Sequence, residues 1–317
     1  MESSLRPLTL GEILDHTAQL YRTNFVLFAG IYAVYAGVVL VLSLAQIGLT
    51  SWLKELELTV LAPALVGVAA LIEALFIIIF AGAVIAAINR AVAWVHLGEP
   101  ATIRGAYLSI LPKLGRYIWL MILTTFYICA PLLLLLILIP LAIFMVPGFT
   151  GGGFGEEALE ALVIFVLVLF FIAWLVYAII MGLRYSLAVP ACVVENLKAR
   201  MALRRSIELS KGSRGRIFLL GLLIIVIQIG LVLLTQVFFV VAAFKQHGHM
   251  LPVWMQALQQ IVNFFTNTFL GPIWATGIAL FYFDQRVRKE GFDIEWMMQA
   301  AGLAAPDPQQ SPGAAHE

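Results

Sequence analysis

The sequence predicts an all-α, polytopic membrane protein with six transmembrane helices and short cytoplasmic amphipathic helices. Three features predict this class: the composition, six long apolar runs, and basic residues that gather on one side of those runs. Hydrophobic residues make up 62% of the 317 residues and charged residues 12%, whereas soluble domains have about 45–50% and about 25%. So few charges cannot cover a water-facing surface of this size, and most of it must face lipid. The formal net charge of +1 gives no basis for nucleic-acid binding.

Six apolar runs are long enough to cross a bilayer, because a transmembrane helix needs about 20 such residues. They cover residues 25–49, 60–88, 117–146, 159–183, 217–244 and 257–283. No water satisfies backbone N–H and C=O groups inside lipid, so each run is predicted to be helical. The first run follows a polar, acidic leader and exceeds the about 7–15 apolar residues of a signal peptide. We therefore expect it to be retained as a span rather than cleaved.

The basic residues predict the orientation of these spans. Seventeen of the 19 Lys and Arg residues fall on the side of the two termini, and only Lys54 and Lys245 fall on the other side. By the positive-inside rule, both termini are expected to be cytoplasmic. Residues 1–302 are predicted to form one transmembrane domain. Residues 303–317, rich in Ala, Pro and Gln, are predicted to be a disordered cytoplasmic tail.

A short amphipathic helix is predicted before the first span. Thr9 and Glu12 have the spacing of a capping box, in which each side chain binds the backbone N–H of the other residue. The residues of one face follow at helical spacing: Leu10, Ile13, Leu14, Thr17 and Tyr21. Such a helix is expected to lie at the membrane interface, with this face against acyl chains or the helix bundle.

Two further segments have a similar character. The second places apolar residues at helical spacing: Ile103, Ala106, Tyr107, Ile110 and Leu111. The third, residues 201–209, is helix-prone with a poorer stripe. Aligning the basic residues Arg22, Lys113 and Lys211 gives periods of 91 and 98 residues. This spacing predicts a threefold parallel repeat over residues 8–90, 99–184 and 197–290. The alternative is that any polytopic protein places basic, semi-helical segments on its inner side.

Polar residues inside the spans are candidates for an intramembrane site. Glu73 is the one ionisable residue well inside a run, and a charge at mid-bilayer costs about 2.5–3.5 kcal/mol. Counting about 20 residues from the inner end of its run places Glu73 near the outer boundary. Glu73 is therefore either a proton or cation site or a structural carboxyl. The last run carries a polar stripe on one helical face: Gln256, Gln260, Asn263 and Asn267.

The stripe has two interpretations. Interhelical amide hydrogen bonds average only about 0.6 kcal/mol in membranes, so ordinary packing is a sufficient explanation. The alternative is a solute pathway that the stripe forms with Glu73, Gln228 and Gln236. We find no phosphate-binding loop, nucleophile motif or zinc-protease motif in the sequence, and His247 and His249 lack a convergent third ligand. We therefore predict no catalytic residue, no metal site and no cofactor.

Four stretches carry a resemblance to a known family. They are residues 5–15 (LRPLTLGEILD), 184–195 (RYSLAVPACVVE), 202–206 (ALRRS) and 281–293 (FYFDQRVRKEGFD). Together they resemble the membrane domain of some bacterial glycerophosphoryl diester phosphodiesterases and related uncharacterised stand-alone membrane proteins. The resemblance implies a location in the bacterial plasma membrane. In those enzymes a separate soluble barrel of about 250 residues performs hydrolysis. Since no segment here is polar and long enough to form it, the resemblance implies no enzymatic activity.

Charged residues within the matched stretches are expected at the inner membrane interface: Arg184, Glu195, Arg204, Arg205, Asp284, Arg286 and Arg288. One interpretation is that arginine–carboxylate pairs tie the third amphipathic segment to the C-terminal segment. The other is a solvated, positively charged loop. In either case a basic interface attracts anionic lipid headgroups, by about 1 kcal/mol per Lys or Arg.

These observations favour a non-enzymatic integral membrane protein that acts as a scaffold or accessory subunit. Its basic amphipathic helices are expected to bind anionic lipid headgroups of the surrounding bilayer, or a protein partner, on the cytoplasmic side. The alternative is a transporter or lipid-handling permease that uses the polar stripe and Glu73.

Overall fold

The computed structural model describes residues 8–56, 61–149, 156–245 and 251–291, and the side chains in these ranges except those of residues 133–149 and 156–160. Within these ranges the chain is helical and contains no strand. Six helices are long and apolar enough to cross a membrane. They are α2 (Phe25–Glu55), α3 (Ala62–His96), α5 (Leu114–Phe149), α6 (Glu156–Tyr185), α9 (Arg214–Lys245) and α10 (Val253–Glu290). The predicted all-α fold with six long apolar helices is confirmed. The predicted tail, residues 303–317, lies outside the described residues.

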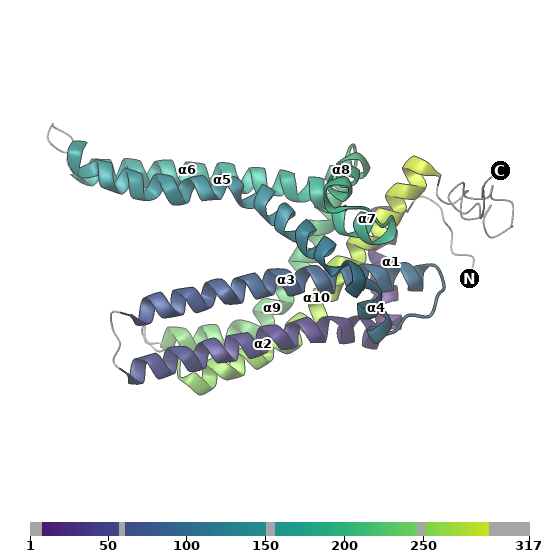
Figure 1. Cartoon of the computed structure of the whole chain (residues 1–317), viewed down its shortest axis with the longest axis horizontal. Helices are drawn as coiled ribbons and strands as arrows, with labels where there is room; N and C mark the ends of the chain where they lie inside the picture. Colours follow the sequence, from purple (N-terminus) through teal and green to yellow (C-terminus); the bar gives the residue numbers. More distant parts are fainter. Residues whose placement is uncertain (1–7, 57–60, 150–155, 246–250, 292–317) are drawn as a thin grey trace, which may run out of the picture.

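The short helices gather where the long helices converge, an end that we call the short-helix end (Figure 1). They are α1 (Leu10–Thr23), α4 (Ile103–Ile110), the 3-10 turn η1 (Leu111–Lys113), α7 (Ala188–Val194) and α8 (Ala199–Ser210). The capping box predicted for α1 is confirmed. The backbone N–H of Thr9 donates to Oε2 of Glu12 at 2.7 Å, and that of Glu12 donates to Oγ1 of Thr9 at 3.3 Å.

The element order places one short helix before each pair of long helices. The three units are α1–α2–α3, α4–α5–α6 and α8–α9–α10, and α7 lies between the second and the third. This order is the one expected for the predicted repeat, and a common origin of the units stays a prediction. In α4, Thr102 Oγ1 accepts from the backbone N–H of Gly105 at 3.1 Å. The predicted stripe of α4 buries Ala106 and Ile110, but Leu111 begins the 3-10 turn and is 59% exposed.

The long helices form two groups (Figure 1). Helices α2, α3, α9 and α10 lie side by side in a four-helix bundle, and every residue of α10 from Ala275 to Gln285 is buried. The first turns of α5 pack on α3, where Tyr117 and Leu120 are buried. The rest of α5 leaves the bundle with α6 as a separate hairpin. Tyr177 of α6 holds this hairpin together, because its hydroxyl donates to the backbone oxygen of Tyr127 at 2.9 Å.

Candidate functional site

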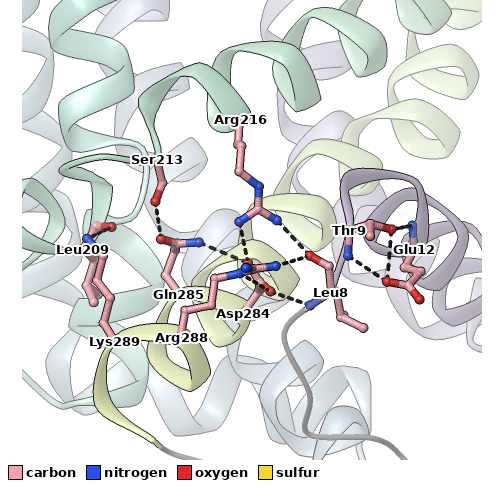
Figure 2. A network of polar contacts seen from close by, with 10 residues as sticks. All are labelled: Leu8, Thr9, Glu12, Leu209, Ser213, Arg216, Asp284, Gln285, Arg288 and Lys289. Carbon is pink, nitrogen blue, oxygen red and sulfur yellow. Dashed lines mark hydrogen bonds and ion pairs between the residues drawn. The ribbon is translucent and has the colours of Figure 1, made fainter.

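A buried carboxylate joins three distant segments at the short-helix end. The side chain of Asp284, near the end of α10, is fully buried. Its Oδ1 accepts from the backbone N–H of Leu8 at 2.8 Å, and its Oδ2 accepts from Arg216 at 3.2 Å and from Arg288 at 2.9 Å. Figure 2 shows these groups converging on the carboxylate. Charge-assisted hydrogen bonds of this kind offset the cost of removing the charge from water.

The same arginines also bind the backbone in front of α1. The carbonyl oxygen of Leu8 accepts from Nη2 of Arg216 at 2.8 Å and from Nη2 of Arg288 at 2.5 Å (Figure 2). The guanidinium of Arg216 lies over the ring of Phe281, 5.4 Å from its centroid. Both backbone groups of Leu8 are therefore satisfied by residues of α9 and α10. These bonds hold the segment before α1 against α9 and the C-terminal part of α10.

Two other residues near the end of α10, Gln285 and Lys289, connect this helix with α8 and with the turn that follows α8. Oε1 of Gln285 accepts from the hydroxyl of Ser213 at 2.5 Å. The ammonium of Lys289 donates to the backbone oxygens of Glu208, Leu209 and Lys211 at 2.7–2.9 Å. A lysine in this place binds carbonyls at the C-terminal end of α8 and complements the negative end of the helix dipole.

A second polar network ties α8 to α10. The carboxylate of Glu195 accepts from Nε of Arg205 at 2.9 Å and from the hydroxyl of Tyr282 at 2.8 Å. Arg205 also pairs with Glu290, which accepts from Nε of Arg286 at 3.1 Å. Burial by itself lowers the pKa of Arg205, but hydrogen bonds and charge from Glu195 and Glu290 outweigh it and raise the pKa. Arg205 therefore stays charged at any physiological pH.

The structure brings together five of the seven charged residues singled out from the sequence. Glu195 and Arg205 pair within the second network and Asp284 and Arg288 within the first, while Arg286 binds Glu290. The other two, Arg184 and Arg204, form no ion pair with the described residues, and Arg204 is exposed. Sequence reasoning missed Arg216, Glu290 and Tyr282 as partners. Tyr282 and Glu290 lie in the stretch 281–293 and Arg216 directly precedes the run 217–244, but no local spacing connects any of them with its partner.

The polar stripe of α10 faces α2 and α9. Oδ1 of Asn263 accepts from Gln236 of α9 at 2.6 Å, and Nδ2 of Asn267 donates to the backbone oxygen of Asn263 at 2.8 Å. Gln260 accepts from Asn263 at 3.3 Å, and Gln256 donates to the backbone oxygen of Leu251 at 2.6 Å. A cavity of about 100 Å³ lies between the stripe and α2. The stripe thus supplies hydrogen bonds that connect α10 with α9.

Glu73 lies outside this group. Its Oε1 accepts from the hydroxyl of Ser43 on α2 at 3.0 Å. Gln228, the other predicted member, donates to the backbone oxygen of Leu270 at 3.0 Å. Of the proposed solute pathway, the structure joins only Gln236 to the stripe by hydrogen bonds. This arrangement supports helix packing more directly than a continuous polar path.

The fold is compatible with the class of integral membrane proteins, since six of its helices are apolar enough to cross a bilayer. Among the described residues, no group of three or more His, Cys, Asp or Glu side chains is placed to hold a metal ion. Comparison of the chain with protein-family models, curated proteins and solved structures found no match in any of the three. The resemblance to the phosphodiesterase membrane domain therefore stays a prediction.

Proposed function

We propose that this protein is a non-enzymatic membrane scaffold whose short-helix end lies at the cytoplasmic interface and binds anionic lipid headgroups. The observation that carries the proposal is a set of exposed basic side chains at this end that form no ion pair with the described residues. They are Arg22, Arg104, Lys198, Arg200, Arg204 and Lys211. Each is free to attract a phosphate, at about 1 kcal/mol near an anionic surface.

Three carboxylates at this end are not available to neutralise this surface. Glu195, Asp284 and Glu290 already bind arginines within the two networks. Exposed apolar side chains accompany the basic ones: Leu108 is 53% exposed and Met201 54% exposed. A surface that combines cations with exposed apolar groups suits the boundary between headgroups and acyl chains. The one-sided distribution of Lys and Arg supports a cytoplasmic placement of this end.

Reversing two of these charges tests the proposal. Arg200 and Arg204 lie one turn apart on α8 and are both exposed, whereas reversing Arg205 would break the second network. The full chain, in nanodiscs of equal phosphatidylglycerol and phosphatidylcholine, is released into mild detergent, and its retained lipids are counted by native mass spectrometry. In Arg200→Glu/Arg204→Glu, we expect the ratio of retained phosphatidylglycerol to phosphatidylcholine to fall at least about fivefold.

Lys54→Glu, a charge reversal at the opposite end of α2, is the matched control. It should leave the ratio of retained lipids near that of the wild-type chain. An unchanged ratio in the α8 variant, or an equal fall in the control, would contradict the proposal. Loss of a co-purifying soluble protein in the α8 variant, with lipid retention unchanged, would favour an accessory subunit instead.

A further inference from the structure

An apolar cavity of about 580 Å³ lies where the α5–α6 hairpin leaves the bundle. Helices α3, α5, α6, α7, α9 and α10 all contribute to its wall, and its volume is within the about 300–1,000 Å³ that is usual for ligand sites. Ile179 of α6, and Phe218 and Ile225 of α9, line the cavity and are 42–46% exposed. The cavity therefore opens sideways between α6 and α9, toward the region that lipid occupies in a membrane.

The wall of the cavity is mostly apolar, and most of its few polar groups lie toward the short-helix end. Nearest that end, it includes Asn89 of α3 and Ser186, which follows α6. One to three turns further along the helices, at about 1.5 Å per residue, most lining side chains are apolar, such as Ile128, Ile225 and Trp274. The hydroxyl of Thr124, which also lines this part, already donates to the backbone oxygen of Leu120 at 2.8 Å. A ligand that matches this wall has a polar group at the short-helix end and an apolar chain directed toward the middle of the membrane.

Asn89 supplies an unused acceptor at the polar end. Its side chain is only 1% exposed, and its Nδ2 donates to the backbone oxygen of Ile85 at 2.8 Å. Its Oδ1 is buried and accepts no hydrogen bond from the described residues. A buried acceptor without a donor is unfavourable in a stable protein. A hydroxyl or other donor from a ligand in the cavity would satisfy it.

Two arginines lie close in the chain to residues that line this end of the cavity, although neither lines the cavity itself. Arg184 directly follows the lining residue Leu183, and Arg214 lies one turn before the lining residue Phe218. Their Nε atoms are buried without a hydrogen-bond partner. Nη1 of Arg184 contacts Sδ of Met181 at 4.0 Å, and neither arginine forms an ion pair with the described residues. Two such guanidinium groups beside an apolar cavity match an anionic phosphate, which accepts charge-assisted hydrogen bonds.

We infer that this cavity binds a phospholipid from the membrane. One acyl chain lies against the apolar wall between α6 and α9, the phosphate meets Arg184 and Arg214, and a donor of the headgroup binds Oδ1 of Asn89. A water-soluble solute fits less well, because the opening faces lipid and most of the wall is apolar. This site goes beyond the proposed function, which concerns headgroups on the exposed surface of the short-helix end.

Photocrosslinking tests the site directly. The full chain is placed in nanodiscs that contain phosphatidylglycerol with a photoreactive group on one acyl chain. Phosphatidylcholine with the same chain serves in parallel, because its headgroup has no hydrogen-bond donor and no net charge. After illumination, adducts are mapped by mass spectrometry. We expect phosphatidylglycerol adducts to concentrate in residues 179–190 and 217–225, with about fivefold fewer from phosphatidylcholine, the effect of one lost hydrogen bond.

Filling the cavity provides the matched variant. Gly182 of α6 lines the cavity, and a Cβ there would meet no atom within 4 Å. Gly182→Leu is therefore expected to fold and to reduce the adducts at least about fivefold by occupying the space of the acyl chain. Gly230→Leu adds the same side chain to α9 at an exposed position that is also unobstructed. It should leave the adducts unchanged.

Asn89→Leu tests the headgroup contact separately. It should lower phosphatidylglycerol adducts about fivefold and leave those of phosphatidylcholine unchanged. Adducts spread evenly over all lipid-facing helices, or unaffected by Gly182→Leu, would overturn the site. Equal adducts from the two lipids would overturn the headgroup assignment. Arg200→Glu/Arg204→Glu should not change adducts in the cavity, so failure of this inference and failure of the proposed function give different results.

Discussion

Helices α6 and α10 differ sharply in mean hydropathy and in how much of each is buried within the protein. The most apolar window of residues Ala161–Val194 has a mean hydropathy of 3.1, and none of it is buried within the protein. The corresponding window of α10 has a mean hydropathy of only 1.2, and half of it is buried. In a soluble protein, the more apolar helix would be the more buried one. Here the order is reversed, because lipid solvates apolar side chains and the protein interior accommodates polar ones.

This comparison shows what holds each helix in place. Helix α10 contributes Asn263 to the contact with α9 and Asp284 to the contact with α1. The α5–α6 hairpin joins the bundle mainly through the first turns of α5 and through the short helices (Figure 1). Substitutions in α10 are therefore expected to affect the stability of the whole fold, whereas most substitutions in the hairpin should change only contacts with lipid.

The largest effect is expected from Asp284→Asn. This change removes the charge that Arg216 and Arg288 bind while preserving the shape of the side chain. Breaking a buried ion pair by removing one partner costs about 3–5 kcal/mol. We expect a clear fall in the midpoint of thermal unfolding, measured in nanodiscs. The exposed Glu99→Gln is the control, and an unfolding midpoint like that of the control would show that the network does not stabilise the fold.

The second largest effect is expected from a matched pair of phenylalanine substitutions, one in α10 and one in α6, whose losses of stability are compared. Phe281 of α10 is fully buried, whereas Phe171 of α6 is 50% exposed. Phe281→Ala leaves a cavity inside the protein and should lower the free energy of unfolding by about 3 kcal/mol. Phe171→Ala exchanges a side chain for lipid and should stay within about 0.5 kcal/mol of the wild-type chain. Equal losses in unfolding experiments would mean that the hairpin is packed as firmly as the bundle.

A matched pair of glycines gives a smaller contrast. A Cβ at Gly271 of α10 would lie 2.1–2.4 Å from ring atoms of Tyr32, whereas one at Gly182 of α6 would meet nothing within 4 Å. Gly271→Ala should therefore destabilise the protein by about 1–3 kcal/mol, because α2 or the tyrosine ring must shift. Gly182→Ala should be neutral or stabilising by up to about 1 kcal/mol, since alanine favours helix. Thermal unfolding of the two variants in the same detergent measures the two changes in stability. A loss of stability in Gly182→Ala without one in Gly271→Ala would contradict the prediction.

The sequence was sufficient to predict the six long helices and the start of α1. Hydropathy located all six long helices, and the Thr9–Glu12 spacing predicted the start of α1. These features depend on residues close together in the chain. The divergence of the hairpin could not be predicted, because α6 is apolar on all sides and its pattern does not distinguish a lipid-facing side from a protein-facing one. The separate short helix α7 was also not predicted.

The candidate sites were less accessible to sequence reasoning. Arg–carboxylate pairing at this end was one of two interpretations, but the partners Arg216 and Glu290 depend on contacts between residues far apart in the chain. Asn89 was not predicted to be a site residue, since a single amide near the end of an apolar run is common. Its significance comes from its burial and from the cavity beside it. Both depend on how six helices meet, which no local pattern specifies.

The contact between Leu8 and Asp284 also has a consequence for biosynthesis. The two residues are 276 positions apart, and ribosomes add about 5–20 residues per second. The segment that contains Leu8 therefore waits on the order of tens of seconds before its permanent partner is made. Until then, the segment before α1 lacks the contact that anchors it in the finished protein. Among the described helices, the last to be translated fastens the first.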